Sequence, residues 1–244
     1  MKYIQDTKNV VIVGGNGALA QAFMTQINRF YPQAQISVLS RSDYIDTHIP
    51  IGLYTLSYAD EAAIVAAVDN ITRNRPIDMA IVTTGTLHAP SRMPEKSMKD
   101  IVAQNLLDVF KINTVVPTIA AKHLIPRLNR QTCSVFAALS ARVGSISDNR
   151  LGGWYAYRAS KAALNMMIKT VSIEAARRNP KALVVGLHPG TVDSGLSKPF
   201  QANVPDGKLF TAAYAAERLL SVLQGLTPEQ TGRCFAWDGQ EILP

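Results

Sequence analysis

The sequence predicts an α/β fold in which helices cover both faces of one doubly wound parallel sheet, giving three layers (α/β/α) in a single domain over residues 1–244. Three observations support this prediction. Strand-like and helix-like runs alternate from end to end. The strand-like runs are almost continuously apolar, as strands buried on both faces are. No linker, internal repeat or low-complexity tract divides the chain.

The strands are predicted from runs rich in β-branched and other apolar residues. The five strong candidates are residues 9–13, 35–40, 77–83, 132–140 and 182–188, and the two weaker ones are 52–56 and 233–237. Helical stretches fall between them, near residues 17–30, 60–74, 98–128, 155–178 and 211–224. Right-handed crossovers between parallel strands would wind these elements into one open sheet.

Charge and composition limit the classes of partner. The net charge is +7, but Lys and Arg are scattered without a basic tract, so we expect no nucleic-acid partner and read the charge as weak support for a phosphorylated ligand. No apolar run approaches the ~18 residues of a membrane helix, and the start "MKYIQDTKNV" lacks the apolar core of a secretory signal. Cys133 and Cys234 form neither a disulfide framework nor a metal-binding spacing. We therefore expect a soluble cytoplasmic protein without a membrane partner or a metal.

The first predicted strand runs into "GGNGALAQAF", where Gly15-x-Gly17-x-x-Ala20 matches the dinucleotide fingerprint in its Gly/Ala form. Glycines let the backbone approach a pyrophosphate, and the N-terminus of the following helix favours its negative charge. The alternative is a plain strand-to-helix turn, which would also use glycine.

The end of the second predicted strand lacks the carboxylate that usually binds the ribose of NAD. Ser40 and Arg41 stand there instead, in "VLSRS", and a guanidinium can bind a 2′-phosphate. This favours NADP(H) over NAD(H) as cofactor. The alternative is an ordinary surface arginine at a strand end.

A tyrosine and a lysine share one helix face in "GGWYAYRASKAALN", residues 152–165. Tyr157 and Lys161 lie four residues apart, whereas Tyr155 lies six from the lysine and so on another face. Apolar residues continue the shared face: Leu164, Ile168, Val171 and Ala175. A neighbouring ammonium would lower a tyrosine pKa from its usual ~10 and suit the phenol to general acid/base catalysis. The alternative is an amphipathic helix with a solvated lysine.

Asn113 interrupts an apolar helix face made of Val109, Val116, Ala120 and Leu124. Four residues later Pro117 has no N–H, which leaves the carbonyl of Asn113 without its usual helical donor. A water bound to that carbonyl could relay protons toward Lys161. The alternative is a proline kink with a solvated asparagine.

Taken together, these residues resemble the short-chain dehydrogenase/reductase family, in its small single-domain branch, over nearly the whole chain. The order of glycine turn, asparagine, serine after the fifth strand, Tyr-x-x-x-Lys and Pro-Gly is the family's order. The segments "GGWYAYRASKAALN", "TGTLH" and "LHPGTVDSGLSKPF" are most similar to carbonyl reductases of the sniffer and C-signal type. The resemblance implies a Rossmann-like fold and a homo-oligomer, dimer or tetramer, paired through the helices that carry Asn113 and Tyr157.

The resemblance also assigns roles by motif position. It implies that Tyr157 is the catalytic acid/base, Lys161 its pKa modulator and a ribose ligand, and Asn113 the proton-relay residue. The cofactor-binding residues that the motifs and the resemblance give together are Gly14, Gly15, Asn16, Gly17, Ala18, Leu19, Ser40, Arg41, Thr84, Gly85, Asn113, Tyr157, Lys161, Pro189, Gly190, Val192 and Ser194.

The sequence departs from the family pattern at several cofactor positions. Two glycines of the family's turn are Ala18 and Ala20, the Asn-Ala-Gly after the fourth strand is Thr83, Thr84 and Gly85, and the adenine-side aspartate is Thr55. An added methyl group can tighten the approach of the cofactor without forbidding it. We therefore expect modest cofactor affinity.

The catalytic serine is the most serious departure. Counting back from Gly144 places it on Ala141, with Ser140 one residue earlier, and a one-residue slip along a strand turns a side chain to the opposite face. Three alternatives are open. Ser140 takes the role if the loop is one residue longer; otherwise Ser145 or Ser147 takes it, or the site has no catalytic serine. We favour Ser140, because the segment is ending its strand and loop geometry can redirect the side chain.

The sequence thus predicts an NADP(H)-dependent oxidoreductase that interconverts a small carbonyl compound, an aldehyde or ketone, and its alcohol. The alternative is a dinucleotide-binding regulatory or signalling protein of the same fold with little or no turnover. Residues 195–210 are the expected substrate lid, and Tyr155 is expected in the pocket wall. We interpret the histidines and the two tryptophans, Trp154 and Trp237, as packing or surface residues; His188 stands at a strand end.

Overall fold

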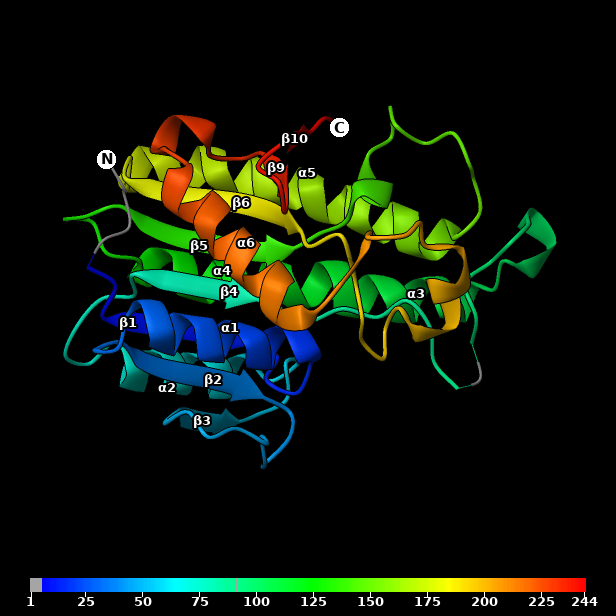
Figure 1. The fold of residues 1–244 in the computed structure, drawn as a ribbon. Helices are drawn as coiled ribbons and strands as arrows, with labels where there is room; N and C mark the ends of the chain where they lie inside the picture. The colour runs from blue at the N-terminus through cyan, green and yellow to red at the C-terminus, as the bar shows by residue number, and fades with distance from the viewer. Residues whose placement is uncertain (1–5, 91) are drawn as a thin grey trace.

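The centre of the computed structural model, which describes residues 6–90 and 92–244, is an eight-stranded sheet with the order β10-β9-β6-β5-β4-β1-β2-β3 (Figure 1). Neighbouring strands are parallel except for β10, which runs antiparallel to β9. Two further short strands, β7 and β8, pair with each other outside this sheet. The predicted fold class is confirmed; residues 1–5 and 91 of the predicted domain lie outside the described residues.

The strands form where apolar runs were expected. Their bounds are β1 (Asn9–Val13), β2 (Gln35–Ser40), β3 (Gly52–Thr55), β4 (Met79–Val82), β5 (Ser134–Leu139), β6 (Ala182–His188), β7 (Thr191–Val192), β8 (Leu209–Phe210), β9 (Cys234–Ala236) and β10 (Glu241–Ile242). All seven predicted strands are present, including the two weaker candidates, which became β3 and β9. The two-residue strands β7, β8 and β10 were not predicted, because their pairing depends on partners distant in sequence.

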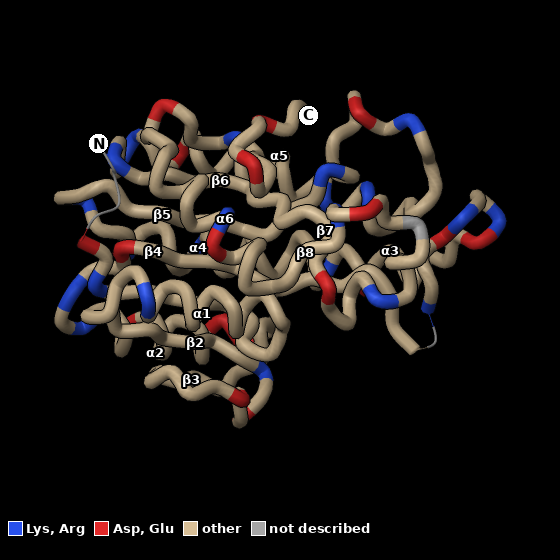
Figure 2. The backbone as a smooth tube through the Cα atoms, viewed as in Figure 1, with Lys and Arg blue, Asp and Glu red and all other residues tan. Residues whose placement is uncertain are grey.

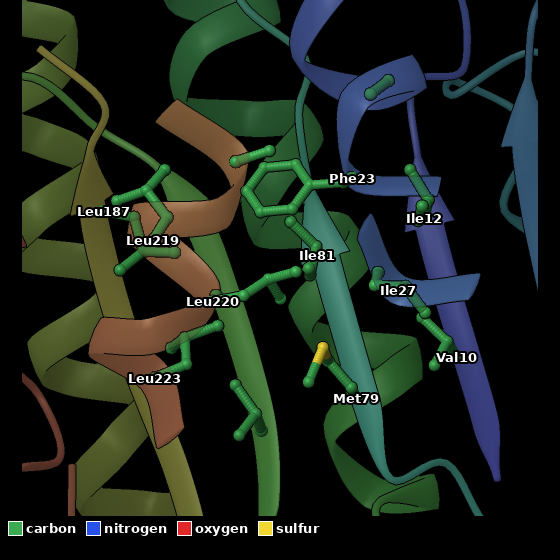
Figure 3. Packing of buried hydrophobic residues seen from close by; sticks show 14 of the residues in the cluster. Val10, Ile12, Phe23, Ile27, Met79, Ile81, Leu187, Leu219, Leu220 and Leu223 are labelled. Carbon is green, nitrogen blue, oxygen red and sulfur yellow. The ribbon is translucent and has the colours of Figure 1, made fainter. Parts of the chain in front are cut away.

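Helices cover both faces of the sheet (Figure 1). One face carries α1 (Ala18–Phe30) and α6 (Ala212–Gly225), and Figure 3 shows Phe23, Ile27 and Leu219 of these helices over strand residues such as Ile12 and Ile81. The other face carries α2 (Glu61–Ile71), α4 (Val116–Leu124) and α5 (Tyr155–Arg178). Each fully buried aliphatic side chain contributes about 1.5–3 kcal/mol, so these two cores hold the sheet.

The predicted helical stretch, residues 98–128, is present, but it is not one regular α-helix. It consists of a 3₁₀ turn (Met98–Asp100), α3 (Ala103–Phe110), a π-helical turn (Lys111–Val115), α4 and a second 3₁₀ turn (Ile125–Arg127). In the π-helical turn the N–H of Val116 bonds the carbonyl of Lys111, five residues back, just before Pro117, which has no N–H. The predicted buried face is nevertheless present, since Asn113 and the apolar residues that share its face are all buried.

The parallel strands bring their carboxyl ends to one edge of the sheet. There the chain leaves β1 at Gly14, β2 at Arg41, β4 at Thr83, β5 at Ser140 and β6 at Pro189. Strand β1 has β2 on one side and β4 on the other, so the order of connection reverses beside it. Crevices at such a switch point are where open α/β sheets bind ligands.

The charges are distributed over the whole molecule. Figure 2 shows basic and acidic residues interspersed along the described backbone. Within residues 6–90 and 92–244, no helix combines the length and the apolar character needed to cross a lipid bilayer.

Gly144 gives a first prediction, because it packs directly against the backbone of α5. A Cβ at this position would lie 2.8 Å from both the carbonyl carbon and the Cβ of Lys161. We expect Gly144→Ala to lower the free energy of unfolding by about 1–3 kcal/mol, measured by urea denaturation. Gly225→Ala is the control, since a Cβ there meets no atom within 4 Å. Equal stability of the two variants would contradict this packing.

Candidate active site

Two clefts lie along the carboxyl edge of the sheet. The first, which we call the glycine cleft, has a volume of about 390 Å³ and is lined by Gly14, Gly15, Asn16, Gly17, Ser40, Arg41, Ser42, Tyr58, Thr83, Thr84, Gly85 and Ile112. Eight predicted cofactor-binding residues therefore lie together: Gly14, Gly15, Asn16, Gly17, Ser40, Arg41, Thr84 and Gly85.

The glycine cleft fits a phosphate-bearing dinucleotide. Gly14 has a φ of +96°, and a Cβ there would come within 2.9 Å of the Thr84 side chain. A Cβ on Gly17 would meet no protein atom within 4 Å, so this backbone is open to a ligand. Gly17 caps α1 without a side-chain hydrogen bond, which leaves the helix N-terminus available to an anion. The buried Oγ1 of Thr84 has no hydrogen-bond partner among the described residues and is a further group for a ligand to bind.

Arg41 stands exposed at the rim of the glycine cleft. Beside it, the Oγ of buried Ser40 accepts a hydrogen bond from the N–H of Ser42 at 3.1 Å. Burial raises the pKa of Tyr58 to about 12, and the positive charge of Arg41 opposes this rise. The Tyr58 hydroxyl donates to the Leu39 carbonyl at 3.1 Å. Tyr58 is a cleft residue that the sequence analysis missed, because no motif marks it.

The second cleft, which we call the tyrosine cleft, has a volume of about 650 Å³. It is lined by Leu19, Leu87, Ser140, Ala141, Arg142, Val143, Leu151, Gly152, Trp154, Tyr157, Arg158, His188, Pro189, Gly190, Thr191, Val192, Ser194, Leu196, Ser197, Phe200, Val204, Pro205 and Lys208. The remaining predicted cofactor residues that line a cleft, Leu19, Tyr157, Pro189, Gly190, Val192 and Ser194, are here. Ala18, Asn113 and Lys161 line neither cleft.

Aromatic rings form one wall of the tyrosine cleft. The ring of Trp154 lies 5.0 Å from that of Phe200 and 6.2 Å from that of Tyr157, measured between centroids. The prediction that Tyr155 belongs to the pocket wall is wrong, because it is not among the residues that line the cleft. Trp154, which we interpreted as packing, takes that place.

Trp154 adopts an uncommon backbone conformation. Its φ is +50°, and it follows Gly152 and Gly153, whose φ values are +64° and +63°. Its N–H donates to the Glu95 carbonyl at 2.6 Å, and the Glu95 carboxylate accepts from the N–H of Ala156 at 3.2 Å in the first turn of α5. Buried Glu95 thus fixes the start of the helix that carries Tyr157.

Tyr157 and Lys161 lie close together, with the Lys161 Nζ 5.9 Å from the centroid of the Tyr157 ring. The predicted lowering of the tyrosine pKa is wrong: burial raises the pKa of Tyr157 to about 12, and burial lowers the pKa of Lys161 to about 8. The Lys161 ammonium donates to the Leu139 carbonyl at 2.7 Å. Withdrawal from water disfavours the charged form of each group, which raises the pKa of the phenol and lowers that of the ammonium.

The side chain of Asn113 is fully buried and is not solvated. Its Oδ1 accepts from the N–H of Thr86 at 2.8 Å, and its Nδ2 donates to the Thr86 carbonyl at 2.9 Å and to the Ser160 hydroxyl at 3.0 Å. A Cβ on Gly85 would lie 3.8 Å from the Asn113 Oδ1 and 3.9 Å from the Lys161 Nζ. The side chains of Asn113 and Lys161 therefore both lie close to Gly85 of the glycine cleft.

Ser140 lines the tyrosine cleft, but its hydroxyl donates to the Asn165 Oδ1 at 2.6 Å, two turns beyond Tyr157 on α5. Ser145 and Ser147 bond each other, and Ser147 also bonds the Pro244 carbonyl, away from the residues that line the cleft. Ala141 does line it. A catalytic role for Ser140 stays a prediction, and its hydrogen bond to Asn165 favours the alternative of a site without a free serine hydroxyl.

Residues 195–210 contribute six residues to the tyrosine cleft: Leu196, Ser197, Phe200, Val204, Pro205 and Lys208. The pairing of β7 with β8 joins both ends of this segment. Near its start, the Gly195 carbonyl lies 3.0 Å from the His88 Nε2. The segment thus covers the cleft from a fixed base.

Two polar residues of the tyrosine cleft, Arg142 and His188, were missed by the sequence analysis. His188 ends β6, and Arg142 begins the 3₁₀ turn that follows β5 (Arg142–Gly144). Their positions after parallel strands were the available signal, because ligands bind at that edge.

The sheet is doubly wound, with a fingerprint turn at its switch point and an adjoining cleft lined by Tyr157. Lys161 lies one turn beyond Tyr157 on the same helix. These features define a dinucleotide-binding oxidoreductase of the NAD(P)-dependent class. A family model described as short chain dehydrogenase matches residues 8–205. The chain belongs to this family.

Individual relatives agree with this assignment. The chain is 33% identical to a protein named C-signal from Myxococcus xanthus over 147 residues. This alignment covers 60% of this chain and 82% of the C-signal protein. The carbonyl reductase Sniffer of D. melanogaster has a similar structure, with a TM-score of 0.82 and 23% identity over 98% of this chain and 100% of that one. An NADPH-bound carbonyl reductase from chicken fatty liver has a TM-score of 0.84 and 19% identity, covering 98% and 95%. At such identities the solved structures show the fold alone.

The lowered pKa of Lys161 predicts a pH dependence of stability. In the folded protein this pKa is about 8 against the ordinary 10.5, so the unfolded chain binds the proton more tightly, and stability rises with pH between these values. Between about pH 7.5 and pH 9.5, this effect should raise the free energy of unfolding of the unmutated protein by on the order of 2 kcal/mol. We expect Lys161→Met to lack this rise. Urea denaturation at both pH values measures the gain.

Tyr157 and Cys234 act in the opposite sense, because their pKa values are raised to about 12 and about 11. Their contributions are lost as pH rises through those values. The Lys161 charge lowers the pKa of Cys234, so Lys161→Met raises that pKa further and steepens this loss. Both effects of the substitution therefore reduce the rise of stability with pH. Lys169→Met, on the exposed side of α5, is the control and should keep the pH dependence of the unmutated protein. A Lys161→Met variant that also keeps it would contradict the burial of a charged ammonium.

Proposed function

We propose that the protein is an NADP(H)-dependent oxidoreductase that interconverts an aldehyde or ketone and the corresponding alcohol, with Tyr157 as general acid/base. The observation that carries this proposal is the position of Tyr157. It lines the tyrosine cleft, while Lys161, one turn along α5, lies behind Gly85 of the glycine cleft. A cofactor spanning the two clefts would thus end beside a proton donor.

Bound NADPH would supply the hydride in the reduction. The protein's own part is the proton: the pKa of Tyr157, raised to about 12 by burial, keeps the phenol protonated at neutral pH, as a donor to a carbonyl oxygen must be. Lys161, with a pKa of about 8, is mostly charged at neutral pH and can return a proton toward Tyr157. These protonation states favour the reducing direction near neutral pH.

The preference for NADP(H) rests on Arg41. Its side chain is exposed at the rim of the glycine cleft, where a carboxylate would instead repel a 2′-phosphate. The chicken carbonyl reductase of similar fold is described as NADPH-bound, which agrees with this choice.

A second candidate function is a dinucleotide-binding regulatory or signalling protein of the same fold with little turnover. The hydrogen bond from Ser140 to Asn165 favours it, because it leaves Tyr157 without a free serine hydroxyl from any of the three candidate serines. The two functions differ in one observable, turnover of a carbonyl compound by a protein that binds NADPH. Pairing of copies through the helices that carry Asn113 and Tyr157, and a cytoplasmic location, stay predictions.

The role of Tyr157 is tested by Tyr157→Phe, which removes the hydroxyl and keeps the ring. We expect the rate of NADPH oxidation with small aldehydes, ketones and quinones to fall by ~10² to 10⁴, the contribution of a general acid, while NADPH binding persists. Tyr155→Phe is the matched control and should keep most of the rate. Full activity of Tyr157→Phe would refute the mechanism, and NADPH binding without any turnover by the unmutated protein would support the second function.

The role of Arg41 is tested by fluorescence titration with NADPH and NADH. The unmutated protein should bind NADPH more tightly, and Arg41→Ala should weaken NADPH binding by about tenfold, the value of a lost charge-assisted contact, with little effect on NADH. Arg73→Ala, an exposed arginine between α2 and β4, should change neither affinity. Equal affinities of the unmutated protein for both nucleotides would overturn the preference.

A further inference from the structure

The charges that line the tyrosine cleft all have one sign. Its described lining includes Arg142, Arg158 and Lys208, and none of the lining residues is Asp or Glu. Most of the other lining residues are apolar or aromatic, including Trp154 and Phe200. A cleft of this kind favours a ligand with an apolar body and a negative charge.

The three positively charged side chains of the cleft differ in the contacts that they already make within the protein. The Nε of Arg158 donates to the Gly152 and Gly153 carbonyls at 3.1 and 3.0 Å, which engages it in holding the loop before α5. The Nζ of Lys208 lies 5.7 Å from the centroid of the Trp237 ring. Arg142 has one ion-pair partner, Asp148, at 3.5 Å, and both side chains are about half exposed, so this pair contributes little. Arg142 therefore keeps donors for a ligand.

Arg142 also lines the same cleft as Tyr157, the proposed acid. It follows Ala141, the position at which the sequence pattern placed the missing serine. Strand β6 runs beside β5 here, because the Ser140 N–H donates to the Leu187 carbonyl at 2.8 Å, and this brings His188 to the same wall. Arg142 and His188 are thus neighbouring polar groups of the cleft that Tyr157 also lines.

His188 provides an independent sign of a missing ligand. Its Nδ1 is buried and has no hydrogen-bond partner among the described residues, although the side chain lines the cleft. The pKa of His188 is lowered to about 4, mainly by burial and also by the positive charge of Arg142, while the negative charge of Asp238 opposes the shift. The His188 ring is therefore neutral at pH 7, and of these two neighbouring residues only Arg142 carries a positive charge. The Nδ1 is thus a polar atom of a cleft residue that the described residues leave unsatisfied.

We propose that the substrate of this cleft is a carbonyl compound that bears a carboxylate on an apolar body, and that Arg142 is the residue that binds the carboxylate. This inference rests on the proposed carbonyl–alcohol activity of the same site. The carbonyl lies toward Tyr157, the apolar body packs against Trp154 and Phe200, and the fork of the Arg142 guanidinium matches the two carboxylate oxygens. Arg142 is then a specificity-determining residue.

The test compares acids with their methyl esters, which keep the carbonyl and the body but lose the charge. Three pairs vary the body: 4-carboxybenzaldehyde, phenylpyruvate and 5-oxohexanoate, each with its ester. With NADPH, we expect kcat/KM of the unmutated protein to be about tenfold or more higher for the acid of at least one pair. Arg142→Leu should remove most of this preference by raising KM for the acid, and Arg142→Lys should restore part of it, since it keeps the charge without the fork.

Arg150→Leu is the matched control, because Arg150 is an exposed arginine a few residues away that does not line the cleft, and it should leave the acid-to-ester ratio unchanged. Equal kcat/KM for acid and ester in all three pairs, or an equal loss for both in Arg142→Leu, would overturn the proposal. NADPH affinity should be the same in all variants, because Arg142 does not line the glycine cleft. A loss of NADPH affinity in Arg142→Leu alone would assign the arginine to the cofactor and also overturn the proposal.

A binding measurement separates this inference from the proposed activity. The protein, with NADP⁺ present, is titrated in a calorimeter with 4-(hydroxymethyl)benzoate and, separately, with its methyl ester. The heat of binding is measured whether or not the protein turns over a carbonyl compound. Binding of the acid that Arg142→Leu weakens by about tenfold or more supports the carboxylate site even if no carbonyl compound is reduced. Turnover of neutral carbonyl compounds with no binding of any acid would support the activity and refute the carboxylate site.

Discussion

The buried amide of Asn113 is the interaction on which the arrangement of both clefts depends. It bonds the N–H and the carbonyl of Thr86, in the segment after β4, and it also donates to Ser160 on α5. The Ser160 hydroxyl in turn donates to the carbonyl of Tyr157 at 2.8 Å. One side chain thus links the segment that carries Gly85 to the helix turn that carries the proposed acid. Each of these groups would cost about 1–3 kcal/mol if left buried without a partner, so the link is held firmly.

The π-helical turn is what allows Asn113 to take this position. It adds one residue to a helical turn, and Asn113 lies within it, with Pro117 just beyond. The neighbouring Thr114 uses the same widened turn to bond the Ser160 carbonyl at 2.8 Å. Two consecutive side chains therefore contact the same residue of α5. Consecutive side chains of a regular α-helix diverge by about 100°, and the wider π-helical turn reduces this divergence.

Periodicity and motif spacing were sufficient to predict the fold and most cleft residues. Properties that depend on residues distant in sequence could not be predicted in this way. The apolar runs gave every long strand, and the four-residue spacing of Tyr157 and Lys161 placed both on one face. The direction of the Tyr157 pKa shift depended on burial by residues distant in sequence, and the spacing alone suggested the wrong sign. Trp154 lines the cleft because Gly152, Gly153 and Glu95 fix its backbone, a combination that no short motif encodes. Arg142 and His188 become neighbours only through the pairing of β5 with β6.

The pairing of β7 with β8 has a consequence for how the specificity of this protein can change during evolution. It closes residues 193–208 into a loop whose ends are fixed next to each other, apart from the main sheet. The entropy of closing a loop grows only with the logarithm of its length, so doubling this segment would cost about 0.6 kcal/mol. Insertions and substitutions there can reshape the cleft while the sheet, the glycine turn and α5 keep their packing. The shape of the cleft can therefore change in this segment at little cost to the stability of the fold.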